Sequence, residues 1–311
     1  MQYFAQVSDP HLSSLEGVRP MQLLSKRALG YLSWSRRRRH EHRAEVLEAL
    51  RQDLEQFKLD QLLVTGDLTH IGLPEEFRQA LSWLQSLGDP ADVAVIAGNH
   101  DASVPTPWQD TFALWQEYMA ADQTGAQVDT LNTFFPTLRE RGDIAFIGLN
   151  TACPKPPLMA TGTVGEAQLS RLPALLDEAY ARGQFRVVYL HHSPLVGKDK
   201  WRKRLTDAEA VQAEIIEHGA ELVLNGHGHR NHYDELATRH GIVPLIAIPS
   251  ASSLGLHGGQ VASYNHYGVE PTPSGWHLSI NSRQFDHSRQ GFVPSLSRTV
   301  DLTRLATAKS A

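Results

Sequence analysis

The sequence of 311 residues predicts an α/β protein with a largely parallel sheet layered by helices. Short apolar runs of strand length alternate along the chain with longer segments whose apolar residues recur at helical spacing, and this alternation predicts parallel strands joined by helices. The segment 261–300 is different, because it is rich in Gly, Ser and aromatic residues and alternates, which predicts antiparallel closing strands. No repeat or linker is visible, so we expect a single domain over residues 1–311.

Each expected element has a local reason. The run 61–65 is apolar on both faces, as in a fully buried strand. Segment 44–57 places Leu47, Leu50, Leu54 and Phe57 on one helical face. Pro74 suits the first turn of a helix over 74–87, in which Phe77, Leu81 and Leu84 would face the core. By the same criteria we expect strands at 3–8, 61–65, 93–97, 144–149, 186–190, 222–224 and 243–248, and helices at 44–57, 74–87, 165–182 and 207–218.

Composition excludes several classes of protein. Apolar residues make up 41% of the chain, yet no apolar run approaches the ~18 residues of a membrane span. No basic leader precedes the first strand, so we expect no signal peptide and a cytoplasmic protein. Cys153 is the only cysteine, which rules out disulfides and thiolate metal sites. The net charge of -5 gives no strong nucleic-acid signal, and the 16 histidines point to imidazole chemistry.

Residues 12–43 do not fit the alternation and are interpreted as a basic amphipathic insertion after the first strand. Lys26-Arg27 and the run Arg36–Arg39 are interleaved with Leu23, Leu24, Leu29, Tyr31, Leu32 and Trp34. Three interpretations remain open. The segment is a solvated charged face, or it lies on an anionic membrane surface through residues 23–39, or it is a lid that steers a phosphate-bearing substrate.

Polar side chains gather where the expected strands end. In an open α/β sheet the loops at these carboxyl ends converge on one crevice. The oxygen and imidazole donors, without sulfur, suit Mn, Fe, Zn or Co, and they are too many for one tetrahedral ion but right for two ions that share a bridging ligand. The glycines at positions 66, 98, 226 and 228 permit the backbone to leave strand geometry. The blocks are Asp9-Pro10-His11, Gly66-Asp67, Gly98-Asn99-His100-Asp101, His191-His192 and Gly226-His227-Gly228-His229.

This ordered set resembles the calcineurin-like metallophosphoesterase superfamily and spans Asp9 to His229, most of the chain. The resemblance implies a four-layer α/β/β/α sandwich around two divalent or mixed-valence metal ions. The first ion would be held by Asp9, His11, Asp67 and His229, and the second by Asp67, Asn99, His191 and His227. His100 would be the catalytic histidine that does not bind metal, and Asp101 beside it would raise the pKa of His100 or fix its tautomer. Of the adjacent pair, His191 is favoured as the ligand over His192.

The motifs resemble most the bacterial class III cyclic-nucleotide and glycerophosphodiester phosphodiesterases. This implies a small phosphoester substrate, most readily a phosphodiester, attacked by a metal-bridging hydroxide while His100, as imidazolium, stabilises the phosphoryl charge or protonates the leaving oxygen. A lipid-linked phosphoester hydrolysed at the membrane surface is the alternative substrate, and a non-catalytic scaffold is the alternative class. The metal's identity and the oligomeric state are left open.

The other histidines are assigned more modest roles. His192 is interpreted as a packed neighbour of the site, and His70 either reaches the mouth of the site or holds its own loop. His257 is a candidate substrate contact. Surface or structural positions are expected for His232, His240, His266, His277 and His287.

Overall fold

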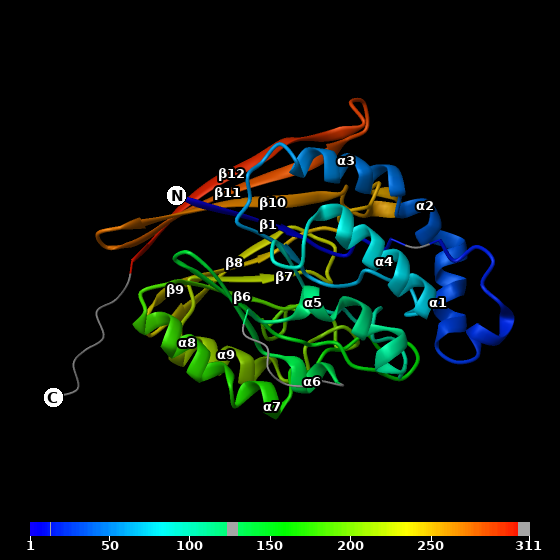
Figure 1. The fold of residues 1–311 in the computed structure, drawn as a ribbon, viewed down its shortest axis with the longest axis horizontal. Coiled ribbons are helices and arrows are strands. Elements are labelled where there is room, and N and C mark those ends of the chain that lie inside the picture. Colours follow the sequence, from blue (N-terminus) through cyan, green and yellow to red (C-terminus); the bar gives the residue numbers. More distant parts are fainter. Residues whose placement is uncertain (13, 123–129, 304–311) are drawn as a thin grey trace.

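The computed structural model describes residues 1–12, 14–122 and 130–303, whose strands form two six-stranded sheets (Figure 1). The first sheet has the order β12 (Gly291–Thr303), β11 (Gly275–Asp286), β10 (Ser263–Thr272), β1 (Gln2–Val7), β2 (Gln61–Val64) and β3 (Val93–Val95). The second has the order β4 (Thr137–Arg141), β5 (Ile144–Gly148), β6 (Phe185–Tyr189), β7 (Leu222–Asn225), β9 (Gly241–Ala247) and β8 (His232–Thr238).

Both sheets are mixed. Strands β1, β2 and β3 are parallel, as are β5, β6, β7 and β9, whereas β4 and β8 pair antiparallel at the edges of the second sheet. Strands β10, β11 and β12 extend the first sheet in antiparallel fashion, which confirms the prediction for 261–300. The predicted strands are parallel to their neighbours, but they are divided between two sheets, which the apolar runs do not reveal because they do not say whether a helix or a second sheet covers each face.

The longer helices are α3 (Ala44–Leu54), α4 (Pro74–Leu87), α8 (Leu172–Ala181) and α9 (Ala208–His218). The bounds of α4 are those predicted, and α3 ends earlier than expected. The single helix expected over 165–182 is two, α7 (Glu166–Leu169) and α8, because Pro173 occupies the first turn of a new helix. Short helices α5 (Gln116–Met119) and α6 (Leu131–Phe134) were not predicted.

Side-chain alternation along the second sheet defines the layers. In β6, Phe185, Val187 and Tyr189 belong to the core shared with the first sheet. Val188 of the same strand and Leu190 after it belong instead to a separate cluster with residues of α8 and α9. A strand whose successive side chains are buried on opposite faces needs a layer on each side.

The first sheet is covered in the same manner. Leu47 and Leu50 of α3 and Phe77 of α4 are in the larger core, and Phe4 of β1 meets Phe146 of β5 between the sheets, with ring centroids 5.1 Å apart. Helices therefore lie outside each of the two stacked sheets (Figure 1), and the expected α/β/β/α sandwich is confirmed.

The insertion is helical. It comprises η1 (Pro20–Leu23), α1 (Arg27–Ser33), the π-helical turn η2 (Trp34–Arg38) and α2 (Arg39–Glu41). Its buried Leu15 and Trp34 pack on Ile71 and Leu73 in a small apolar cluster of their own. The Arg27 guanidinium donates to the carbonyl oxygens of Ile71 at 3.1 Å and Gly72 at 2.6 Å. The insertion is thus held against the loop that follows β2.

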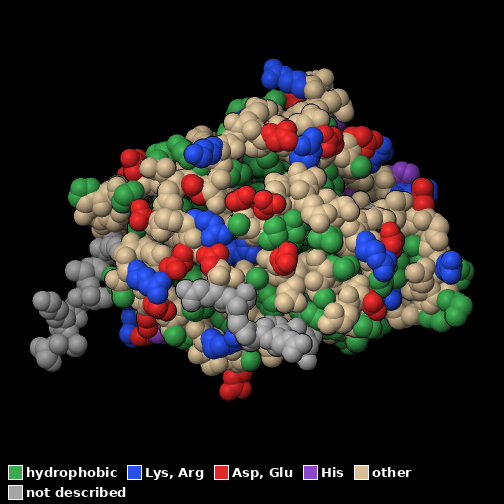
Figure 2. All heavy atoms as spheres, viewed as in Figure 1, with side chains coloured by type: hydrophobic (Ala, Val, Ile, Leu, Met, Phe, Trp, Pro, Cys, Tyr) green, Lys and Arg blue, Asp and Glu red, His purple; other side chains and the backbone are tan. Residues whose placement is uncertain are grey.

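Charges of both signs are interspersed over the face seen in Figure 2. In the described part of the chain, every helix is too short or too polar to cross a bilayer.

Candidate metal centre

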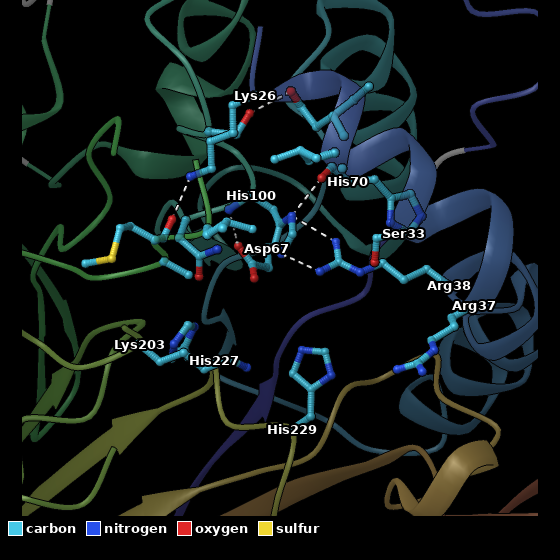
Figure 3. A pocket seen from close by; sticks show the side chains of 18 of the residues that line it. Lys26, Ser33, Arg37, Arg38, Asp67, His70, His100, Lys203, His227 and His229 are labelled. Carbon is cyan, nitrogen blue, oxygen red and sulfur yellow. Dashed lines mark hydrogen bonds between the residues drawn. The ribbon is translucent and has the colours of Figure 1, made fainter. Parts of the chain in front are cut away.

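The carboxyl ends of the parallel strands of both sheets meet at one place. Asp9, Asp67 and Asn99 follow β1, β2 and β3 of the first sheet, while His191 and His227 follow β6 and β7 of the second. The site therefore lies where the two sheets adjoin, and Figure 3 shows Asp67, His227 and His229 around one cavity.

The structure brings together all seven residues that the resemblance assigned to metal. Ligand atoms of Asp9, His11, Asp67 and His229 lie within 4.8 Å of one another, and so do those of Asp67, His191 and His227. Asp67 is common to both groups. The amide oxygen Oδ1 of Asn99 is 3.3 Å from Nε2 of His191, which places Asn99 with the second group.

Five of these residues have left-handed backbone. Their φ angles are positive although none is glycine, at 50° for Asp9, 43° for His11, 57° for Asp67, 64° for His227 and 51° for His229. Asp, Asn and His tolerate this region better than most residues, but it remains uncommon and costs free energy. The strand-end turns thus hold strained residues that aim their side chains into one space.

The glycines act in two different ways. Gly66 has a positive φ of 93°, as expected for a residue that redirects the chain. Gly98 and Gly226 instead provide room. A Cβ at Gly98 would lie 2.2 Å from Oδ1 of Asp67, and one at Gly226 would lie 1.9 Å from Oγ of Ser8. At Gly228 the nearest atom to an added Cβ would be 3.9 Å away and φ is not positive, so neither the room nor the conformation at this position requires glycine.

The histidine rings are oriented as metal ligands require. Nδ1 of His11 lies 3.0 Å from the carbonyl oxygen of Thr69, and Nδ1 of His191 lies 2.7 Å from that of Thr65. A carbonyl oxygen only accepts, so each Nδ1 carries the proton and each Nε2 offers its lone pair to the site.

Buried ring nitrogens of two candidate ligands, Nε2 of His11 and Nε2 of His227, lack a hydrogen bond. Oδ1 of Asp9 lies 3.0 Å from Nε2 of His229. Buried polar atoms are nearly always hydrogen-bonded, so the nitrogens of His11 and His227 need another partner. Cations fit this requirement, and the carboxylate, amide and imidazole donors suit divalent transition metals.

Burial and charge shift the pKa values of the site in opposite directions. Burial, together with neighbouring histidines, lowers the pKa of His11 and of His227, which keeps both rings neutral. Burial acts in the same direction on His191, but the nearby Asp67 and Asp9 carboxylates outweigh it and raise the pKa of His191 to about 9. A metal cation bound between His191 and the two carboxylates would replace the second ring proton of His191.

Asp101 has a different position from the one expected. Its buried carboxylate accepts hydrogen bonds from the backbone amides of Gly98 at 2.8 Å, Asp67 at 3.0 Å and Thr69 at 2.8 Å, and from the Thr69 hydroxyl at 2.9 Å. Burial and the Asp67 carboxylate raise the pKa of Asp101, against the effect of these donors. Asp101 thus ties the Asp67 loop to the Asn99 loop, and the expectation that it acts directly on the His100 ring is corrected.

His100 is contacted instead by His70 and Arg38. Nδ1 of His100 lies 2.7 Å from the carbonyl oxygen of His70 and therefore carries the proton. Nε2 accepts a hydrogen bond from Nη2 of Arg38 at 2.9 Å. Burial, followed by the Arg38 charge, lowers the pKa of His100 well below its usual value. The ring is neutral near pH 7, so the expected imidazolium is corrected as well, and the fixed positive charge lies on Arg38.

A cavity of about 740 Å³ opens on this site (Figure 3). One wall is the insertion, which contributes Lys26, Leu29, Arg37 and Arg38, and His229 faces the His100–Arg38 pair across the space. Within the insertion, Lys26 and Arg38 are partly buried at the cavity, whereas Arg36, Arg37 and Arg39 are exposed. The other side chains at the cavity include cations and small or apolar residues, among them Arg27, Leu158, Met159, Lys203 and Arg230.

The remaining histidines divide clearly. Both ring nitrogens of His192 are engaged, Nδ1 at 2.7 Å from the Thr151 hydroxyl and Nε2 at 3.1 Å from the Ala160 carbonyl, as expected for a packed neighbour. His70 lines the cavity, as its first alternative has it, and its backbone amide donates to the nearby Glu76 carboxylate at 2.7 Å, as its second alternative has it. The side chain of His257 lies outside the described residues. Among the described residues, the candidate metal groups include none of His232, His240, His266, His277 and His287.

Two residues of the insertion were missed as members of the site. Arg38 contacts His100, and His42 forms a further group of possible ligands with His11 and His229. Both lie in the segment interpreted from its charge alone, and the only signal for His42 was a histidine at the end of that segment.

The α/β/β/α sandwich and the two overlapping ligand groups together define a class of protein, the metal-dependent phosphoesterases. The family model described as calcineurin-like phosphoesterase matches residues 3–231, and the chain belongs to this family of phosphoric ester hydrolases. A search of curated proteins gives no match.

The chain is similar to several solved structures at low sequence identity. A dimetal phosphatase from Danio rerio is 12% identical, with a TM-score of 0.58, and the alignment covers 96% of this chain and 98% of that one. A 5'-nucleotidase precursor from Thermus thermophilus is 13% identical, with a TM-score of 0.45 and coverage of 97% and 54%. Vps29 from Chaetomium thermophilum is 12% identical, with a TM-score of 0.42 and coverage of 98% and 100%.

Proposed function

We propose that the protein hydrolyses a phosphodiester of the cyclic-nucleotide or glycerophosphodiester type with the help of two metal ions. The observation that carries this proposal is the pair of ligand groups joined through Asp67, beside the hydrogen-bonded pair of His100 and Arg38. The cavity of about 740 Å³ supports a diester, because it leaves space for an ester group on each side of the phosphorus.

The proposed division of labour follows from the geometry. Asp9, His11, Asp67 and His229 would hold one cation, and Asp67, Asn99, His191 and His227 the other. When bound, two such cations, of which Mn, Fe, Zn and Co suit these donors, acidify a water and draw electron density from the phosphoryl group. Arg38 would contact a phosphoryl oxygen. Once Arg38 turns to the substrate, the neutral Nε2 of His100 would take up the proton that the attacking water loses and pass it to the departing ester oxygen.

A substrate panel tests the diester preference. We would compare kcat/KM for bis-(p-nitrophenyl) phosphate, p-nitrophenyl phosphate, cyclic nucleotides and glycerophosphodiesters, each with Mn, Fe, Zn or Co supplied separately. We expect diesters to exceed monoesters by at least about tenfold, a difference of about 1.4 kcal/mol in the barrier. Equal or faster turnover of monoesters would contradict the diester assignment. Metal binding without turnover of any ester would favour the scaffold, a reading opposed by the competent residue at every ligand position.

A specific observation favours the alternative, a lipid-linked phosphoester at an anionic membrane surface. Met21 and Leu24 of the insertion are 81% and 75% exposed, and Leu158 at the cavity is 70% exposed. Arg37, which lines the same cavity as Leu158, is exposed, and so is its neighbour Arg36. Large exposed apolar side chains beside basic ones suit the boundary between lipid headgroups and acyl chains.

Vesicle sedimentation tests this alternative. A peripheral membrane location would be supported if the protein binds phosphatidylglycerol vesicles but not phosphatidylcholine vesicles. Salt and the double variant Met21→Ser, Leu24→Ser should both weaken this binding. The matched control is Val196→Ser, because Val196 is 53% exposed but lies outside the insertion. If the double variant and the Val196→Ser control bind the vesicles equally, the insertion does not bind the membrane surface.

A further inference from the structure

His42 lies at the candidate metal centre although it is in none of the motif blocks. It follows α2 at the end of the insertion, and its ligand nitrogen lies within 4.8 Å of those of His11 and His229. The centroid of its ring is 4.5 Å from that of His11 and 5.9 Å from that of His229. Two nitrogen donors that share one ion, each about 2.1 Å from it, can be at most about 4.2 Å apart, so small side-chain adjustments bring these three into coordinating distance.

The position of His42 is fixed from both sides. Its backbone amide donates to the carbonyl of Arg38 at 2.8 Å, and the amide of the next residue, Arg43, donates to the carbonyl of Ser252 at 3.1 Å. The preceding Glu41 carboxylate accepts from the backbone amides of Gly255 at 2.9 Å and Leu256 at 3.1 Å. The end of the insertion is therefore bound to the loop that follows β9.

The ring of His42, like the rings of the motif histidines, has a hydrogen-bond partner at Nδ1. This nitrogen is 2.8 Å from the hydroxyl of Ser252, an oxygen that can accept the Nδ1 proton as the carbonyl of Thr69 does for His11. The neighbouring Ser250 hydroxyl donates to the carbonyl of Asp9 at 2.7 Å, so the serines that orient His42 also contact a motif residue. An imidazole with Nδ1 held by an outer partner presents Nε2 to a metal.

We propose that Nε2 of His42 is an additional ligand of the first metal ion, supplied by the insertion. This inference rests on the proposed metal-dependent function. The first site would then combine two groups of possible ligands that share His11 and His229, one completed by the imidazole of His42 and the other by the carboxylates of Asp9 and Asp67. Such a set favours Zn, Fe, Co or Ni over Mn and Mg, because imidazole suits the former and oxygen ligands suit the latter.

The variant His42→Ala tests the proposal, with His40→Ala as its matched control. His40 is an exposed histidine of the same insertion and contacts only the Arg39 side chain among its hydrogen bonds in the described part of the chain. Metal content after dialysis against graded chelator, Zn and Mn affinity, and the visible absorption of bound Co(II) are measured for both variants and the unaltered protein. Thermal unfolding of the metal-free proteins checks that each is folded.

We expect His42→Ala to retain one tightly bound ion, to bind the other at least about tenfold more weakly, and to lose more affinity for Zn than for Mn. Its Co(II) absorption should change, while His40→Ala behaves as the unaltered protein. If His42→Ala unfolds without metal, His42→Gln serves in its place, because the amide can still bond Ser252 without supplying an imidazole.

Unchanged affinity for both ions and an unchanged Co(II) spectrum in His42→Ala would overturn the proposal. A rise in KM alone, with metal binding intact, would also overturn it by assigning His42 to the substrate. Absence of metal binding by the unaltered protein would instead refute the proposed function, so the two failures are distinguishable.

Discussion

The guanidinium of Arg38 lies against the imidazole of His100, with Nη2 2.9 Å from Nε2 and Nη1 3.0 Å from Nδ1. One residue comes from the insertion and the other from the loop after β3. Because the Nδ1 proton is donated to the carbonyl of His70, the contact at Nε2 is the hydrogen bond between the two side chains. A fixed cation thus accompanies a histidine that burial keeps neutral.

The first prediction concerns Arg38. Arg38→Ala should lower kcat by about 10²- to 10³-fold, the usual effect of removing one preorganised donor to a phosphoryl or acyl oxygen. Loss of the Arg38 charge should also raise the pKa of His100, so the acid limb of the pH–kcat/KM profile should move to higher pH. Metal content should stay unchanged. Arg36→Ala, which alters an exposed arginine of the same run, is the control. If kcat falls but the acid limb of the profile does not move, Arg38 does not act through His100.

The second prediction separates metal binding from turnover. Asp67→Ala should lose both metal ions and activity, because Asp67 belongs to both ligand groups. His100→Ala should keep both ions and lose about 10²- to 10⁴-fold in rate, since the hydrogen bond to Oδ1 of Asp67 comes from the His100 backbone amide, at 2.7 Å, and survives the substitution. Metal analysis and turnover of bis-(p-nitrophenyl) phosphate measure the two effects. Full activity in either variant would remove that residue from its role.

The third prediction compares two glycines two residues apart. A methyl group at Gly226 would displace the Ser8 hydroxyl, which donates to Oδ2 of Asp9 at 2.6 Å, so Gly226→Ala should destabilise the protein by about 1–3 kcal/mol and weaken metal binding. Gly228→Ala meets open space without a positive φ and should stay within about 1 kcal/mol of the unaltered protein. Denaturant unfolding of both variants checks this. If both variants lose the same free energy of unfolding, the loss comes from the conformation of the loop and not from the lack of room beside Asp9.

The fourth prediction concerns acid. Burial lowers the pKa values of His11, His42, His100, His192 and His227. As the pH falls below about 6.5, the unfolded chain therefore takes up protons that the folded chain refuses, and the free energy of unfolding decreases. The raised pKa of Asp101 opposes this decrease, but it is the effect of one group against five. The raised pKa of His191 stabilises the folded protein fully below about pH 6.5, and this stabilisation is lost as the pH rises through about 9.

Unfolding of the metal-free protein by denaturant, repeated between pH 8 and pH 5, measures the balance. We expect the free energy of unfolding to fall by more than about 1.4 kcal/mol per pH unit below pH 6.5, because more than one proton is taken up. A flat profile over that interval would mean that the buried histidines are protonated in the folded protein.

Sequence reasoning located the strand ends and the side chains that follow them, because each block of polar residues interrupts an apolar run. It could not separate one sheet from two. The residues of β6 are buried on both faces in either arrangement, and contacts such as that of Phe185 with Trp276 of β11 show that a second sheet covers one face. Strands β4 and β8 were missed because they are edge strands with polar side chains such as Arg139 and Glu235.

At the site, the motif residues were predictable and their supports were not. The left-handed φ of Asp9 or Asp67 has no signal beyond a residue type that tolerates it. The four donors to Asp101 come from backbone amides and one hydroxyl, whose directions depend on the folded loops. Arg38 and His42 reach the site through the path of the insertion, and composition carries no information about that path.

The position of the candidate centre between the two sheets also affects how the sandwich holds together. Asp9, His11 and Asp67 extend from the first sheet, and His191, His227 and His229 from the second. An ion that binds ligands from both would cross-link the halves of the sandwich and stabilise them by mass action. Chelation would then loosen the seam between the sheets at this end, and amide hydrogen exchange in β1, β2, β6 and β7 would report that loosening strand by strand.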